Sequence, residues 1–328
     1  TSPSSLQTYG FLGSDKNAGK TTAMGFVSKK FRDQGKRILF SSVGINGECV
    51  DTYEGIPKPS IKLSPGDFFV TASAHLSGNS GKFRMIQCFG PPEFSRNYCL
   101  CQALISQSWI LEGPNDLASL VNLKEGLKEW ETNLIVLLDG SIDRQFLGHP
   151  KICDYFYFSL LITDRKEQIE KASQLLEPIH FKACSNEQRE WIQKIVRTQT
   201  RSLLFDESGM LVYEGFQPPF LDSELKSKIR PLASNSCTLY LNGALTHSLC
   251  NFLSPYQNWR IILDNFTLYQ RISVTKEKRS FRPEICLFHP LRLKGIFLRE
   301  VSFQSLDLPE KIPIHNIYRE DSDAISIS

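Results

Sequence analysis

The pattern of hydrophobic and polar positions at the start of the chain predicts a strand, a turn and a helix. An apolar run at residues 9–12 is followed by small and polar residues, and apolar residues then recur at helical spacing over residues 20–34. Three of them fall on one face of the predicted helix, namely Met24, Val27 and Phe31. Residues 37–41 predict a second strand, which completes a strand–helix–strand unit.

The rest of the chain also alternates between predicted strands and helices. Short β-like runs separated by glycine, proline and serine fill residues 61–112, and a helix over residues 115–130 leads into an apolar strand at residues 134–139. This order predicts an α/β fold with a doubly wound, mostly parallel sheet of the P-loop NTPase class. We assign residues 1–60 and 113–320 to this α/β domain, residues 61–112 to a β-rich insertion and residues 321–328 to a flexible tail.

Composition narrows the class of protein. The 328 residues are 41% hydrophobic and 22% charged, and 38 basic against 35 acidic side chains leave a net charge of +3. This balance argues against nucleic acid or an anionic membrane as the main partner. The sequence has no apolar stretch of the length that crosses a bilayer. Nine cysteines scattered without metal-ligand spacing favour a reduced, cytoplasmic protein.

Two of the cysteines stand close enough in the sequence to act together. Cys99 and Cys101 are two positions apart in a predicted strand and therefore share a face of it. A pair of core residues is the favoured interpretation, and a metal or redox site is the alternative. The six histidines show no paired spacing for zinc.

The segment between the first strand and the first helix carries the strongest candidate chemistry. A phosphate-binding loop needs small residues whose backbone N–H groups face phosphate oxygens, a helix N-terminus, a lysine and a hydroxyl group for the metal. Lys20 would contact the β- and γ-phosphates of ATP, Thr21 would bind Mg²⁺, and Lys16 is a second cation within reach. The predicted nucleotide-binding residues are Gly13, Ser14, Asp15, Lys16, Asn17, Ala18, Gly19, Lys20, Thr21 and Thr22.

The loop departs from the strict phosphate-loop pattern by one residue. In G-x-x-x-x-G-K-[ST], counting back from Lys20 places Ser14 where the first glycine is expected, and Gly13 lies one position earlier. The simpler alternative is an ordinary strand-to-helix turn with a chance Gly-Lys-Thr. The complete strand–helix–strand unit around the loop favours nucleotide binding.

Acidic residues further along the chain are candidates for binding the metal and positioning the attacking water. The apolar run at residues 134–139 ends in Asp139, a predicted Mg²⁺ ligand, with a turn residue at the strand end as the alternative. Glu48 and Asp51 lie in a segment rich in glycine and proline after the second strand, and they are either catalytic or solvated loop residues. We expect residues 44–59 to act as a switch that responds to the γ-phosphate.

Several stretches, in order along the chain, together resemble one family. They are the loop from Gly13 to Thr22 and residues 47–59, 67–72, 138–144, 242–246, 289–290 and 312–317. In these stretches the chain is similar to the P-loop proteins encoded beside lysine 5,6-aminomutase and related adenosylcobalamin aminomutases, described as the small, ATP-binding reactivase subunit. The resemblance implies a protein partner, either the large reactivase subunit or the aminomutase itself. Asn316 stands where the family pattern has an aspartate, so no role is assigned there.

The loop alone also resembles that of dethiobiotin synthetase, which has serine or threonine at the position of Ser14. This resemblance implies an ATP-dependent ligase for a small substrate, with a lysine just after the second strand, where Ser42, Val43 and Gly44 stand instead. A nucleotide-binding scaffold without turnover is a third alternative. The favoured function is a slow Mg²⁺-dependent ATPase that uses Lys20 with Glu48 or Asp51 and acts on a protein partner. A homodimer is one of the possible oligomeric states.

Overall fold

The chain forms two compact units in a computed structural model, residues Thr1–Leu175 with Arg292–Ser328 and residues Leu176–Leu291. The structure describes residues 6–46, 61–131, 133–140, 145–232, 236–253, 255–256, 258–269, 284–300 and 308–316. Each unit is built on its own β-sheet. Within these ranges, none of the helices combines the length and the apolar character needed to cross a lipid bilayer.

The first unit contains a nine-stranded sheet with the order β19-β18-β11-β1-β10-β2-β5-β7-β6. Neighbouring strands are parallel from β19 to β5, and β7 and β6 are antiparallel to their neighbours. The strands are β1 (Gln7–Gly13), β2 (Arg37–Ser42), β5 (Phe68–Ala72), β6 (Phe83–Phe89), β7 (Tyr98–Ala103), β10 (Leu134–Asp139), β11 (Tyr155–Ile162), β18 (Leu293–Glu300) and β19 (Ile314–Asn316).

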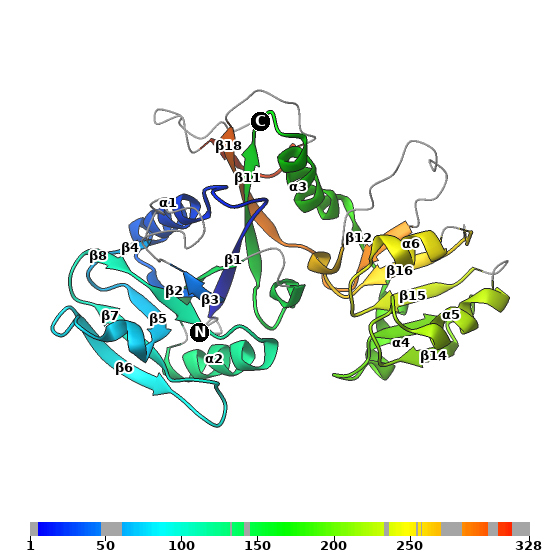
Figure 1. Cartoon of the computed structure of the whole chain (residues 1–328), viewed down its shortest axis with the longest axis horizontal. Coiled ribbons are helices and arrows are strands. Elements are labelled where there is room, and N and C mark those ends of the chain that lie inside the picture. Colours follow the sequence, from blue (N-terminus) through cyan, green and yellow to red (C-terminus); the bar gives the residue numbers. More distant parts are fainter. Residues whose placement is uncertain are drawn as a thin grey trace. The chain divides into compact units, whose positions relative to one another are not determined.

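Helices cover both faces of this sheet (Figure 1). Along β10, alternate side chains point to opposite faces, so Ile135 and Leu137 pack in one apolar cluster while Leu134 and Val136 pack in another. The first cluster contains Met24 and other residues of α1, and the second contains residues of α2. The helices of this unit are α1 (Lys20–Asp33), α2 (Leu117–Trp130), α3 (Lys166–Leu176), η1 (Ser73–Leu76) and η2 (Gln145–Gly148). The sheet is therefore doubly wound, as predicted.

The path of the chain reverses around β1. From β1 the chain passes through α1 to β2, which lies on the far side of β10, and after β10 it crosses back to β11 on the other side of β1. In open α/β sheets, ligands bind beyond the carboxyl ends of the strands at such a reversal. The loop that begins at Gly13 and the side chain of Asp139 both lie at these ends.

The predicted β-rich insertion does not form a separate body. The strands β5, β7 and β6 extend the large sheet. Among the described residues, two short pairs form in addition, β3 (Gly44–Asn46) with β9 (Leu111–Gly113) and β4 (Ile61–Leu63) with β8 (Gln107–Trp109). All five residues of β5 are buried, as expected of an inner strand. Short strands separated by turns have the same sequence pattern whether they extend a sheet or form a new one, so periodicity could not separate the two cases.

Residues Leu176–Leu291 form a second unit, whereas the sequence pattern predicted one continuous α/β domain up to residue 320. Its sheet has the order β12-β17-β16-β15-β13-β14, with parallel pairing from β12 to β15. The strands β13 and β14 pair antiparallel. The strands are β12 (Lys182–Ala183), β13 (Ser202–Phe205), β14 (Leu211–Gly215), β15 (Thr238–Leu241), β16 (Arg260–Leu263) and β17 (Glu284–Leu287). The helices are α4 (Asn186–Ile195), α5 (Ser223–Ile229), α6 (His247–Leu253), η3 (Glu177–His180), η4 (Arg230–Leu232) and η5 (Phe266–Leu268).

Candidate nucleotide-binding site

The loop between β1 and α1 has a backbone conformation suited to binding an anion. Asn17 and Gly19 both have positive φ angles, 59° and 88°, on either side of Ala18. Left-handed residues in such a turn direct successive backbone N–H groups into one concave surface. Gly19 is the N-cap of α1 and supplies no side-chain cap, and the first turn of α1 contains no acidic residue. The positive end of the helix dipole is therefore not neutralised by a carboxylate of its own first turn.

Lys20 and Asp139 come together at the carboxyl edge of the sheet. The parallel register of β1 and β10 sets Phe11 opposite Asp139, and α1 starts just beyond the end of β1. The Nζ of Lys20 donates a hydrogen bond to the carbonyl oxygen of Gly140 at 2.8 Å and lies 3.4 Å from Oδ1 of Asp139. The Asp139 side chain is 7% exposed and that of Lys20 is 28% exposed. A lysine and a nearly buried carboxylate therefore lie next to each other where the sequence predicts that phosphate and the metal bind.

Gly13 makes room for the side chain of Lys20. A Cβ atom added to Gly13 would lie 3.1 Å from both Cγ and Cδ of Lys20 and 3.3 Å from the carbonyl oxygen of Asp15. These distances are shorter than an ordinary van der Waals contact, so a larger residue would displace the lysine stem. The glycine one position before the expected one therefore leaves space for the stem of Lys20.

Ser14, at the position of the expected first glycine, links β1 to the neighbouring strand. Its backbone N–H donates to the carbonyl oxygen of Ser159 at 2.9 Å, and its Oγ accepts a hydrogen bond from the backbone N–H of Leu161 at 3.0 Å. Ser14 is 5% exposed. The hydroxyl group thus supplies an acceptor to β11 at the point where β1 ends, which a glycine could not do.

Charged residues from distant parts of the chain surround the loop. Lys171 of α3 lies with its Nζ 3.4 Å from Oδ1 of Asp15, and this carboxylate also accepts the backbone N–H of Lys16 at 2.8 Å. The pKa of Lys171 is raised, mainly by its hydrogen bond to Glu167 and further by the charge of Asp15. Arg299 of β18 donates from Nη1 to the carbonyl oxygen of Asn17. The sequence pattern gave no signal for Lys171 or Arg299, because only the fold brings α3 and β18 to the loop.

The remaining predicted site residues differ in how far the structure describes them. Thr21 is half-buried in the first turn of α1, Ala18 is buried, and Lys16 and Thr22 are exposed. Glu48 and Asp51 lie outside the described residues, as does most of the predicted switch at residues 44–59. The structure therefore brings together the loop, Lys20 and Asp139.

The segment after β2 lies at the same edge of the sheet as the loop. Ser42 is opposite Asp139 in the register, and the backbone N–H of Val43 donates to the carbonyl oxygen of Asp139 at 2.9 Å. A Cβ atom added to Gly113 would lie 2.2 Å from the carbonyl oxygen of Ser42, so β9 approaches β2 more closely than any other residue type would allow. Ser42 and Val43 are buried in the place where the ligase resemblance requires a lysine.

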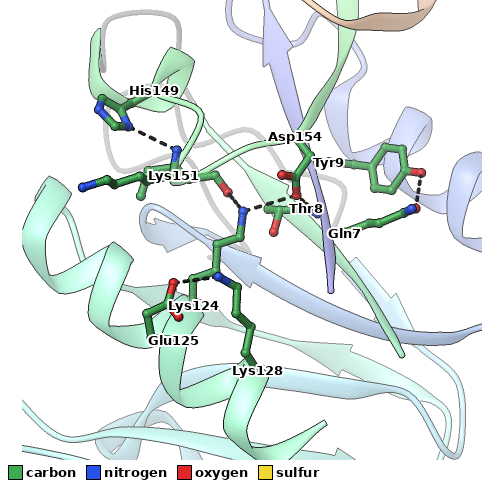
Figure 2. Close-up of polar contacts among 10 residues, drawn as sticks. Gln7, Thr8, Tyr9, Lys124, Glu125, Lys128, His149, Lys151 and Asp154 are labelled. Atoms are coloured by element: carbon green, nitrogen blue, oxygen red, sulfur yellow. Dashed lines mark hydrogen bonds and ion pairs between the residues drawn. The ribbon is translucent and has the colours of Figure 1, made fainter. Parts of the chain in front are cut away.

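A second lysine and carboxylate meet near the amino end of β1, and Figure 2 shows their surroundings. Lys124 of α2 donates to the carbonyl oxygen of Ile152 at 3.0 Å and lies 3.2 Å from Oδ2 of Asp154. The same oxygen of Asp154 accepts the backbone N–H of Thr8 at 2.8 Å. These groups satisfy one another and tie α2 to β1 and β11, so this pair is structural and distinct from the pair at the carboxyl edge.

Comparison with models of known protein families gives no match for this sequence. Comparison with curated proteins also gives no match. The family resemblance of the sequence therefore remains a prediction, and the functional proposal rests on the geometry of the loop and its neighbours.

Proposed function

We propose that the chain binds Mg²⁺–ATP at the loop between β1 and α1 and is an NTPase of the P-loop class. The observation that carries the proposal is the position of the Lys20 Nζ, between the carbonyl oxygen of Gly140 and the carboxylate of Asp139, at the N-terminus of α1. Phosphate-binding loops combine a helix N-terminus, a turn with left-handed residues and a lysine, and these features at the loop support the proposal.

The donor groups at the loop fit the predicted ligand. The backbone N–H groups near Gly19 and the ammonium group of Lys20 would hold phosphate oxygens. A carboxylate and a hydroxyl group, from Asp139 and Thr21, are ligands of the kind that Mg²⁺ prefers. When bound, Mg²⁺ would neutralise charge on the phosphates.

Lys20 has two internal partners that it would exchange for phosphate. Its ammonium group donates to the Gly140 carbonyl and faces Asp139, and it is partly exposed on the side of the loop. An exchange of partners would free the Asp139 carboxylate for the metal while keeping the lysine charge paired. Glu48 and Asp51 remain the predicted residues for positioning water.

We infer further that nucleotide binding and slow hydrolysis act on a protein partner, which by the family resemblance is an adenosylcobalamin-dependent aminomutase or its large reactivase subunit. The alternative is a ligase of the dethiobiotin synthetase kind. The buried Ser42 and Val43 at the end of β2 weigh against the ligase, because that site would need a lysine there.

Calorimetry of the full chain with Mg²⁺ and ATP, ADP or GTP tests the proposal. We expect saturable binding of a nucleoside triphosphate that Lys20→Met weakens strongly and that Lys29→Met, at an exposed position of the same helix, leaves unchanged. No heat of binding with any of the three nucleotides would overturn it. ATP consumption that requires a small carboxylate or amine substrate, and no protein partner, would favour the ligase.

A further inference from the structure

Two cysteines face each other across the antiparallel strands β6 and β7. Cys88 is directly opposite Cys99 in the strand register, and their Sγ atoms lie 3.1 Å apart as free thiols. A disulfide has an S–S distance of about 2.03–2.05 Å, so the two sulfur atoms need to approach by roughly 1 Å to become bonded. Directly opposed residues of an antiparallel pair have Cα atoms about 4.5–5.5 Å apart, which lies within the range that a disulfide spans.

A bulge in β6 creates this pairing. Met85 is opposite Cys101 and Gln87 is opposite Leu100, so β6 carries one additional residue between them. In a regular strand, residues three positions apart lie on opposite faces. Here the Sγ of Cys88 lies 3.3 Å from the Sδ of Met85, on one face, while Ile86 packs into the cluster on the other face. Without the bulge, Cys88 would point away from Cys99.

The two thiols differ in their access to solvent. Cys88 is exposed on β6, which is the outer strand of the sheet, and Cys99 is fully buried. Burial, and to a smaller extent contact with Cys88, raise the pKa of Cys99 to about 12. Because the thiolate is the attacking species and must reach its reagent, Cys88 is the sulfur that a dissolved oxidant meets first.

We propose that Cys88 and Cys99 are a dithiol site that closes to a disulfide by exchange with a low-molecular-weight disulfide of the glutathione type. The Cys88 thiolate attacks one sulfur of the reagent, which forms a mixed disulfide on Cys88 and releases one thiolate that takes up a proton. Cys99, after losing its proton, attacks the Cys88 sulfur and displaces the second thiol. The two protein thiols are oxidised, and the reagent is reduced to two thiols.

The site is independent of the proposed nucleotide function. It lies on the two outermost strands at one end of the sheet, whereas the loop follows β1, and β10, β2 and β5 stand between β1 and β7 in the strand order. The Cys88–Cys99 disulfide would link the end of β6 to the start of β7 and so close the segment that connects the two strands. The chemistry can therefore be measured without nucleotide, and its failure would leave the nucleotide proposal untouched.

The experiment uses the full chain with Cys49→Ser, because Cys49 lies outside the described residues and its thiol would complicate the count. Reduced protein is equilibrated in buffers of increasing ratio of oxidised to reduced glutathione, quenched in acid, alkylated and mapped by peptide mass. We expect a linked pair of peptides containing Cys88 and Cys99, with no lasting glutathione on Cys88.

Variants assign the order of the two steps. Cys99→Ser should trap glutathione on Cys88, and Cys88→Ser should leave Cys99 as a thiol over the same time. Cys101→Ala is the matched control, because Cys101 shares the strand and the face of Cys99, and it should still form the disulfide. A glutathione adduct that stays on Cys88 in the protein with both cysteines, or a link from Cys88 to Cys101, would overturn the proposal without need of any variant.

Discussion

The hydroxyl oxygen of Ser14 accepts the backbone N–H of Leu161, 3.0 Å away across two neighbouring parallel strands. This bond extends the pairing of β1 and β11 by one step beyond Gly13, the last residue of β1. It fixes the direction in which the loop leaves the sheet. The position where the loop departs from the phosphate-loop pattern therefore has a packing function of its own.

We predict that Ser14→Gly, which restores the strict pattern, destabilises the protein. The substitution leaves the buried N–H of Leu161 without its acceptor, at a cost of about 1–3 kcal/mol, and glycine adds chain entropy to the unfolded state. Chemical denaturation measures the change in the free energy of unfolding. Ser106→Gly, at an exposed position between β7 and β8, is the control for the entropy term. If both substitutions lower the free energy of unfolding by the same amount, the hydroxyl group of Ser14 makes no contribution to stability.

Lys20→Met should weaken ATP binding strongly while the fold is kept. Methionine retains the apolar stem that passes Gly13 and removes the ammonium group. A hydrogen bond to a charged group contributes about 1.5–3 kcal/mol, which corresponds to roughly a 10- to 150-fold increase in Kd. Calorimetric titration measures the Kd, and circular dichroism checks the fold. An unchanged Kd would place the nucleotide elsewhere.

Asp139→Asn should separate metal binding from phosphate binding. The amide keeps the size of the side chain but loses the negative charge that faces Lys20 at 3.4 Å. We expect the dependence of ATP affinity on Mg²⁺ concentration to weaken, while binding of ATP in the absence of Mg²⁺ is unchanged or tighter. The same Mg²⁺ dependence in the variant and the parent protein would remove Asp139 from the metal site.

The buried pair near the amino end of β1 should respond asymmetrically to substitution. Asp154→Ala removes the carboxylate from the nearly buried Lys124 ammonium, and breaking a buried pair in this way costs about 3–5 kcal/mol, an upper figure here because Asp154 is 32% exposed. Lys124→Met should lower the free energy of unfolding less, because the Asp154 carboxylate still accepts the hydrogen bond from the backbone N–H of Thr8 and is partly exposed to solvent. Urea denaturation of both single variants and the double variant measures the coupling. If the losses in the two single variants add up to the loss in the double variant, Lys124 and Asp154 are not coupled, and the prediction is wrong.

Stability should fall in mild acid because of His315. Its ring packs against Phe297 and Phe26, with centroids 5.0 Å and 4.9 Å away, and burial, together with the charge of Lys30, lowers its pKa. An unfolded histidine titrates near about 6.5, so the unfolded state binds more protons just below that pH. The contribution is fully present above this value and is lost as the pH falls through the lower folded pKa.

The measurement for His315 is the melting temperature as a function of pH. His315→Phe keeps the aromatic packing and should flatten the decline between about pH 7 and pH 5. Lys30→Gln should reduce the decline partly, because it removes only the smaller cause of the shift. A decline of the same size in His315→Phe would assign the pH dependence to other groups.

Local patterns predicted the elements near the loop because each depends on neighbouring residues. The apolar run before Gly13, the helical spacing after Lys20 and the apolar strand that ends in Asp139 are all short-range signals. Parallel strands then place the carboxyl ends at one edge, so the meeting of Lys20 and Asp139 was predictable.

The contacts of Arg299 and Lys171 were not predictable in this way. Both depend on which strands and helices become neighbours, and a single sequence gives no measure of that. The pairing of Cys88 with Cys99 depends on one additional residue in β6, whereas a regular alternation would have separated them. The division at Leu176 was missed for a related reason, since strands alternate with helices in the same way on both sides of it.

The insertion of the second unit between β11 and β18 has a consequence for synthesis on the ribosome. A nascent chain that has emerged up to Leu175 contains β11 but not β18, the strand that pairs with it on the side away from β1. Residues Leu176–Leu291 must be translated first, which takes on the order of ten seconds at about 5–20 residues per second. During this time β11, with apolar residues such as Phe158 and Leu160, is an open sheet edge. Truncation before residue 292 would make that exposure permanent, so such fragments should depend on chaperones and aggregate without them.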